Sequence, residues 1–187
     1  MKTSAFTRLL RHQWFDDTDA RRAVPPELSE RLERRVAASE RRHTGEIRIY
    51  VEGSLPFSYL WRHWRDKTPI EQIVRERAVM IFSKLRMWDT THSNGVLIYL
   101  LLAEHAIELV ADRGVNRHVS ATEWKAMVDR LGAALRERRI EDGLTQALAE
   151  VSTVLVEHFP ESPESTEDGT TPGASPVNQL PDEPVLR

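Results

Sequence analysis

Oxygen-bearing side chains flank the apolar runs of this sequence. Asp89 and Asn94 lie in a polar loop before one run, Asp112 follows the next run, and Glu46 opens the first. Carboxylate and amide oxygens suit Ca²⁺ or Mg²⁺ better than zinc, so these four residues are candidate cation ligands. Turn and capping roles would also explain these residue types. His92 lies in the same loop, and an isolated loop histidine is more often solvated than bound to a metal.

A phosphate-binding group stands beside these candidates. If a metal at Asp89 and Asp112 activated a water molecule, Arg113 could hold the substrate phosphate, which gives a metal-assisted phosphatase of phosphate monoesters. The chain nevertheless lacks cysteine and the GxGxxG, GxxxxGK[ST], GxSxG and HExxH motifs. Because no catalytic motif is complete, a non-catalytic binding or accessory module is the leading expectation.

Aromatic and cationic residues alternate from Trp61 to Arg65. Trp61 and Trp64 could bind a protein partner, or stack on nucleobases in a weak nucleic-acid site. Alternatively, the two tryptophans close the core while the arginines face water.

Helical and alternating apolar patterns predict the elements that position these residues. In chain order they are helix 27–42, strand 46–52, a connection over 53–68, a helix capped by Thr68 with Glu71, strand 96–102, strand 106–112, a helix capped by Ser120 with Glu123, and a helix after Arg139. The order α-β-α-β-β-α-α predicts an α/β fold with a small mixed sheet sandwiched by helices.

Strand connections bring the candidate ligands together. The helical crossover makes the first two strands parallel, and the turn at Glu104 and His105 makes the next pair antiparallel. Residues 89–94 should therefore lie beside residues 112–114, with residues 44–46 at the same rim of the sheet.

Composition divides the chain into three parts. Residues 1–27 form an N-terminal arm with a possible short helix carrying Phe6 and Trp14, and residues 28–160 form the α/β domain. Residues 161–187 hold six acidic side chains and one arginine, with many Pro, Ser and Thr, and we expect a disordered acidic tail. Arm and tail would engage a protein partner.

No apolar run approaches the roughly 20 residues of a membrane helix, and the N-terminus has no continuous apolar segment. We therefore expect a soluble cytoplasmic protein without a membrane span. The chain outside the acidic tail is close to electrically neutral, which makes nucleic acid an unlikely partner.

Several stretches resemble the TPM-domain family over roughly residues 28–160. They are His43-Thr44-Gly45-Glu46-Ile47-Arg48, the run from Trp88 to Tyr99 with its Asn94-Gly95-Val96 strand start, Ala111-Asp112-Arg113-Gly114-Val115, and Gly143 with His158-Phe159-Pro160. The family is named for thylakoid-lumen, photosystem-repair and receptor-modulating members.

The resemblance implies an α/β/α sandwich. Some members of the family are credited with phosphatase-like activity, and some bind calcium at acidic loop residues, which here correspond to Asp89, Asn94 and Asp112. This chain departs from the common pattern because it shows no signal peptide or membrane helix, and because Ser93 stands where many members have a second Asn or an acid.

Overall fold

The computed structural model describes residues 12, 15, 17–137, 139–161 and 180–187. Its helices are α2 (Asp17–Ala23), α3 (Pro26–Glu40), α4 (Phe57–Asp66), α5 (Ile70–Lys84), α6 (Ala121–Arg136) and α7 (Ile140–His158), and its strands are β1 (Ile47–Glu52), β2 (Val96–Leu101), β3 (Ala106–Ala111) and β4 (Val185–Leu186). Within the described residues, no helix is both long and apolar enough to cross a bilayer.

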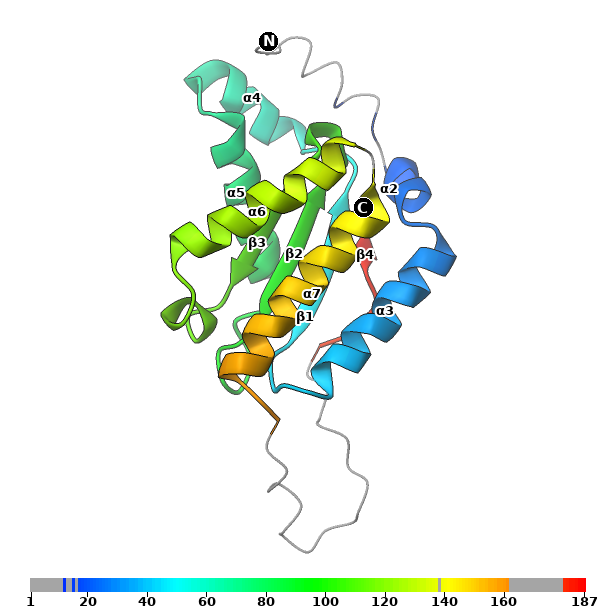
Figure 1. Ribbon diagram of the computed structural model, residues 1–187. Coiled ribbons are helices and arrows are strands. Elements are labelled where there is room, and N and C mark those ends of the chain that lie inside the picture. Colours follow the sequence, from blue (N-terminus) through cyan, green and yellow to red (C-terminus); the bar gives the residue numbers. More distant parts are fainter. Residues whose placement is uncertain (1–11, 13–14, 16, 138, 162–179) are drawn as a thin grey trace, which may run out of the picture.

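The strands form one mixed sheet in the order β3-β2-β1-β4. β1 is parallel to β2 and β2 is antiparallel to β3, as the connections predicted. Figure 1 shows α3, α6 and α7 on one face of the sheet and α5 on the other, so the α/β sandwich is confirmed. Because both faces are covered, every residue of β1 is buried, although its apolar residues alternate with polar ones as in a strand with one solvated face.

Apolar side chains separate by face into two cores. Ile49 and Ile98 point into the core shared with α3, α6 and α7, whereas Tyr50 and Tyr99 point into the core shared with α4 and α5. Successive residues of a strand therefore face the two helical layers in turn.

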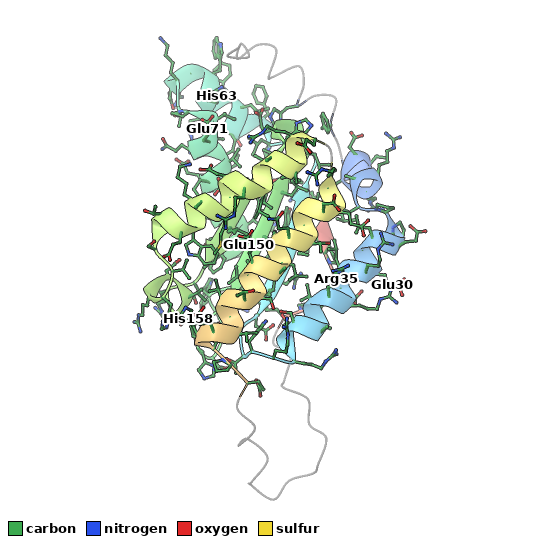
Figure 2. All side chains as sticks on the ribbon, in the orientation of Figure 1. Glu30, Arg35, His63, Glu71, Glu150 and His158 are labelled. Carbon is green, nitrogen blue, oxygen red and sulfur yellow. The ribbon has the colours of Figure 1, made fainter. Side chains whose placement is uncertain are left out.

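A helix, α4, replaces the predicted connection over residues 53–68. Its apolar residues recur at helical spacing, and Leu60 turns into the core at 6% exposure. The predicted Thr68 cap is wrong, because Pro69 is the N-cap of α5 and no side chain caps this helix. The Thr68 carbonyl lies instead 2.6 Å from Nδ1 of His63. Figure 2 labels His63 on α4. The capping box of Ser120 and Glu123 is present as predicted.

The terminal segments differ from expectation where the structure describes them. Residues 180–187 are not a disordered tail, because Val185 and Leu186 pair in parallel with Tyr50 and Val51 of β1. Residues 162–179 lie outside the described part, as does most of the predicted helix over residues 6–14. His12 is the described residue of that predicted helix. It is buried, and its Nδ1 accepts the Leu55 backbone N–H at 3.1 Å.

A buried ionic network joins both middle strands to α5. Arg77 Nε and Nη2 donate to the Glu52 carboxylate at 2.9 and 2.5 Å, and the Tyr99 hydroxyl donates to the same group at 2.6 Å. Burial, reinforced by the Glu52 charge, raises the pKa of Tyr99 well above its ordinary value, so its hydroxyl keeps its proton. The Arg77 guanidinium also lies 5.5 Å from the centroid of the Tyr59 ring on α4.

Removing one member of this network should strongly destabilise the fold. We expect Arg77→Met to lower the free energy of unfolding by about 3–5 kcal/mol, because the Glu52 carboxylate is left buried without its cation. Urea unfolding monitored by circular dichroism measures the change. In the matched control Arg31→Met, which breaks the exposed pair with Glu141, the loss should stay below about 1 kcal/mol. Equal losses in the two variants would contradict this account.

Candidate functional site

Backbone hydrogen bonds bring the predicted rim segments together. The Asp112 N–H donates to the Gly95 carbonyl, and the Gly114 N–H donates to the Ser93 carbonyl, each at 2.9 Å. The start of β1 lies at the same end, because the Asn94 side-chain amide donates to the Thr44 hydroxyl at 3.1 Å. The structure therefore places the 89–94 loop, residues 112–114 and residues 44–46 at one end of the sheet.

Two rim residues carry buried oxygens without a hydrogen-bond partner in the described part of the chain. Asn94 is 1% exposed, and its backbone N–H and side-chain amide are satisfied by Thr90 and Thr44, whereas its Oδ1 accepts nothing. Asp112 Oδ1 accepts the Arg113 N–H at 2.7 Å, whereas Oδ2 is buried and accepts nothing. Unpaired oxygens of this kind are chemically suited to a hard cation.

The other candidate ligands, Asp89 and Glu46, belong to the same end of the sheet but form no metal-binding group with Asn94 and Asp112 in the described residues. Asp89 is exposed and its nearest ion-pair partner is Arg86, at 3.8 Å, while His92 is exposed on the same loop. Glu46 is 5% exposed, and its charge acts on residues outside the rim loops. Among the described residues, no three His, Cys, Asp or Glu side chains form a group that could hold a metal ion. The oxygens of Asn94 and Asp112 alone fall short of the six to eight ligands that calcium takes.

Arg113, the predicted phosphate-binding residue, is exposed at the rim. Its Nε donates to the Ser93 hydroxyl at 3.3 Å. Ser93 adopts a left-handed backbone conformation, with φ of 52°. Arg113 therefore stabilises the turn that carries Asn94, and its charge stays accessible to solvent.

Sequence reasoning missed a buried polar cluster next to the rim. Ser39 Oγ lies 2.8 Å from His43 Nε2 and donates to Ser152 Oγ at 2.6 Å, and Arg42 donates to Ser152 at 2.7 Å. The Ser39 hydroxyl donates to Ser152, so its oxygen is available to accept a hydrogen bond from His43 Nε2. Ser39 and His43 are 3% and 1% exposed, which closes this pair to a substrate. The i, i+4 spacing of Ser39 and His43 was the available signal.

A second cluster joins α3, β1 and the C-terminal segment. Glu40 accepts the Ile47 N–H at 2.9 Å and lies in the field of Glu46 and Asp182. Burial, followed by these neighbouring carboxylates, raises the pKa of Glu40 to about 8 despite the opposing backbone bond. Arg48, which is 7% exposed, provides the nearby positive charge. No sequence pattern linked Glu40 to a residue about 140 positions further along the chain.

The aromatic face of α4, defined here as Phe57, Trp61 and Trp64, is open to solvent. Their exposed fractions are 63%, 46% and 59%. The ring centroids are 6.1 Å apart between Phe57 and Trp61, and 5.0 Å apart between Trp61 and Trp64. The alternative that Trp61 and Trp64 close the core is therefore wrong, because the core-facing side of this helix is occupied by Leu60.

Rim packing predicts a steric effect at Gly95. A Cβ atom at this position would lie 2.1 Å from the Met87 carbonyl oxygen, so backbone must move. We expect Gly95→Ala to lower the free energy of unfolding by at least about 2 kcal/mol. The matched control Gly132→Ala has no neighbour closer than 3.8 Å and lies in α6, so its stability should stay equal or rise by up to about 1 kcal/mol. Thermal unfolding distinguishes the two, and a neutral Gly95→Ala would refute the close packing.

Two buried groups make the stability of the fold depend on pH in opposite directions. Glu40 titrates near 8 when folded and near 4.5 ordinarily, so the folded state keeps a proton that the unfolded chain loses, and stability falls as pH rises toward 8. Burial lowers the pKa of His43 from 6.5 to about 4, so its contribution is present above pH 6.5 and is lost as pH falls toward 4.

Between pH 6.5 and 8, only the Glu40 effect of this pair remains. Urea unfolding at pH 6.5, 7.2 and 8 should therefore show declining stability in the native chain and a flatter profile in Glu40→Gln. Glu30→Gln is the matched control, since Glu30 is exposed on the same helix (Figure 2) and should keep the native decline. An equal slope in native chain and Glu40→Gln would contradict the assignment.

Comparisons with known proteins agree with this architecture. The BA42 protein of the psychrophilic bacterium Bizionia argentinensis, solved by NMR, is similar with a TM-score of 0.66 at 20% identity, over 87% of this chain and 94% of that one. At this identity the likeness shows the fold alone. Comparison with curated proteins gives no match. The family model of the TPM domain matches residues 18–154, which is most of the chain, and the protein therefore belongs to the TPM-domain family.

Proposed function

We propose that this chain is a non-catalytic protein-binding module that docks its partner through the aromatic face of α4. The observation that carries the proposal is the exposure of Phe57, Trp61 and Trp64 side by side on one helix. Exposed aromatic clusters are costly in water and are enriched at the centres of protein interfaces. These rings therefore have the chemistry of binding anchors.

Their spacing supports a helix-in-groove mode of recognition. Phe57, Trp61 and Trp64 stand at positions i, i+4 and i+7, the pattern with which an amphipathic helix fills an apolar groove. Seven residues of helix span about 10 Å, so the partner would need an apolar groove of at least this length. In Figure 1, α4 lies at one end of the molecule, away from the C-terminal end of α7, which leaves the helix accessible.

The cations beside the rings favour a protein over nucleic acid. Arg62 donates to Glu76, and Arg65 donates to Asp66 at 2.7 and 3.1 Å. Carboxylates thus already accompany the guanidinium groups that would otherwise attract phosphate. Single-strand binding combines base stacking with cations that contact the phosphates. Because the arginines here already pair with carboxylates, apolar contact with a protein is the better-supported use of these rings.

A divalent cation at the rim is a second candidate ligand. It is supported by the two buried oxygens, Asn94 Oδ1 and Asp112 Oδ2, that accept no hydrogen bond within the described chain. These residues would supply two of its ligands, and the ion would neutralise the Asp112 charge and fix the turn. The cytoplasmic location expected from the sequence also stays a prediction.

Binding measurements with a purified partner test the proposal. Photo-crosslinking from position 58, which is exposed on the same helix, identifies the partner. The dissociation constant should then rise at least about 30-fold in Trp61→Ala and in Trp64→Ala, as expected of buried aromatic anchors. The control Val79→Ala removes another exposed apolar side chain, on α5, and should leave affinity within twofold. Unchanged affinity in both tryptophan variants would refute the docking surface, and steeply salt-dependent binding of single-stranded DNA would favour nucleic acid instead.

The same variants should fold normally, which separates binding from stability. We expect the double variant Trp61→Ala, Trp64→Ala to change the free energy of unfolding by about 0.5 kcal/mol or less, because roughly half of each ring is already exposed to solvent. Trp124→Ala should instead cost about 3–5 kcal/mol, since Trp124 is 8% exposed and its Nε1 donates to Asn116 at 3.0 Å. Urea unfolding of the three chains decides the point.

A further inference from the structure

A slot for an extended segment runs along the outer edge of β1. We call this edge, from Ile47 to Gly53, the tail slot. Residues 180–187 occupy it, with the Arg187 N–H donating to the Val51 carbonyl at 2.9 Å and the Gly53 N–H donating to the Arg187 carbonyl at 2.6 Å. Figure 1 shows β4 beside β1, and α2 lies against both strands.

Side chains of the occupying segment enter both cores. Leu180 and Val185 pack against the core that contains Tyr50 and Tyr99, whereas Leu186 packs against the core on the opposite face. Asp182 lies beside Glu40 at the start of β1 and shares a hydrogen bond with it. Main-chain pairing combined with alternating side-chain contacts is the way in which sheet edges recognise peptides.

The main-chain hold on this segment is small. β4 pairs with β1 through two residues, whereas β1 pairs with β2 through six. An edge strand with only two paired residues belongs to the less stable part of a fold, from which local opening without global unfolding is expected. The segment can therefore leave while the remaining sheet stays folded.

The connection to α7 is much longer than the gap it closes. The Glu161 N–H donates to the Arg42 carbonyl and the Thr44 N–H donates to the Phe159 carbonyl, so the chain leaves α7 near the start of β1. Asp182 lies at the same end of β1, beside Glu40. The 18 residues from 162 to 179 could reach roughly 60 Å when extended, far more than two neighbouring points require.

We propose that the tail slot is a peptide-binding site, that residues 180–187 are its detachable intramolecular ligand, and that it accepts in trans an extended peptide of the same pattern. The pattern is an apolar residue, an acid two positions later and two adjacent apolar residues three positions after the acid, as in Leu180, Asp182, Val185 and Leu186. The site lies on a different element from the aromatic face of α4 and is independent of it.

A competition experiment on the full chain tests the slot. Val185→Asp with Leu186→Asp places charges where the segment must enter the cores, and should free the slot while circular dichroism stays native. A fluorescein-labelled peptide of sequence LPDEPVLR should then bind this variant one to one by anisotropy. It should bind the native chain at least tenfold more weakly, because the tethered segment competes at an effective concentration near millimolar. A control peptide, LPDEPDDR, should bind neither chain.

Two results would overturn the proposal. One is a folded variant that binds no LPDEPVLR peptide, and the other is equal binding of the peptide by both chains. If the variant fails to fold, hydrogen exchange of the native chain decides. The Gly53 and Arg187 amides should exchange at least 100-fold faster than the Val96 amide, which pairs with Glu46 at 2.8 Å inside the sheet. Equal exchange at all three amides would show a segment that is a fixed part of the sheet.

Discussion

A buried charge pair, Glu52 with Arg77, determines how the parts of this molecule fit together. Neither charge can stay in the interior without the other, so β1 and α5 are held in one relative position. Tyr99 adds β2 through its hydroxyl, and Tyr59 adds α4 because its ring lies near the Arg77 guanidinium. The next residue after Glu52, Gly53, supplies a main-chain bond to the segment that carries β4. One ionic network thus anchors both surfaces to which we assign binding.

The two ends of the sheet have different chemistry. At the end where β1 and β2 begin, polar residues are used largely to hold turns, as Asn94 does with Thr90 and Thr44. Near the other end, the aromatic rings of α4 lie on the surface instead of packing into the core. Aromatic residues this exposed contribute less to the stability of the fold than buried ones do. Their presence on α4 is therefore better explained by binding than by folding.

Sequence patterns were sufficient for the parts of the fold governed by local periodicity. The apolar runs of β1 to β3, the crossover through α5 and the Ser120 cap follow from residue spacing. Helix α4 stands where a connection was predicted, although Phe57, Leu60, Trp61 and Trp64 recur at helical spacing, because three of these apolar residues face solvent and so give no core-facing stripe. β4 could not be predicted, since two apolar residues in an acidic stretch form a strand only when an open sheet edge supplies their partners.

The candidate site was predictable to the level of segments but not of side chains. Strand connectivity correctly brought residues 89–94, 112–114 and 44–46 together. It could not reveal that Asp89 faces solvent, since loop conformation decides the direction of that side chain. The clusters around His43 and Glu40 depend on contacts between distant elements, for which sequence spacing carries almost no information.

If α4 presents an accessible aromatic face to a protein partner, its tryptophans must be reactive in the free chain and protected in the complex. Hydroxyl-radical footprinting with mass spectrometry tests it directly, because it reports the exposure of each tryptophan in the free and bound chain. In the free chain, Trp61 and Trp64 should oxidise about as readily as Trp88, which is 50% exposed, and far faster than Trp124. The partner should protect Trp61 and Trp64 while Trp88 stays reactive. If Trp61 and Trp64 are as protected as Trp124 in the free chain, or stay fully reactive in the complex, the account is contradicted.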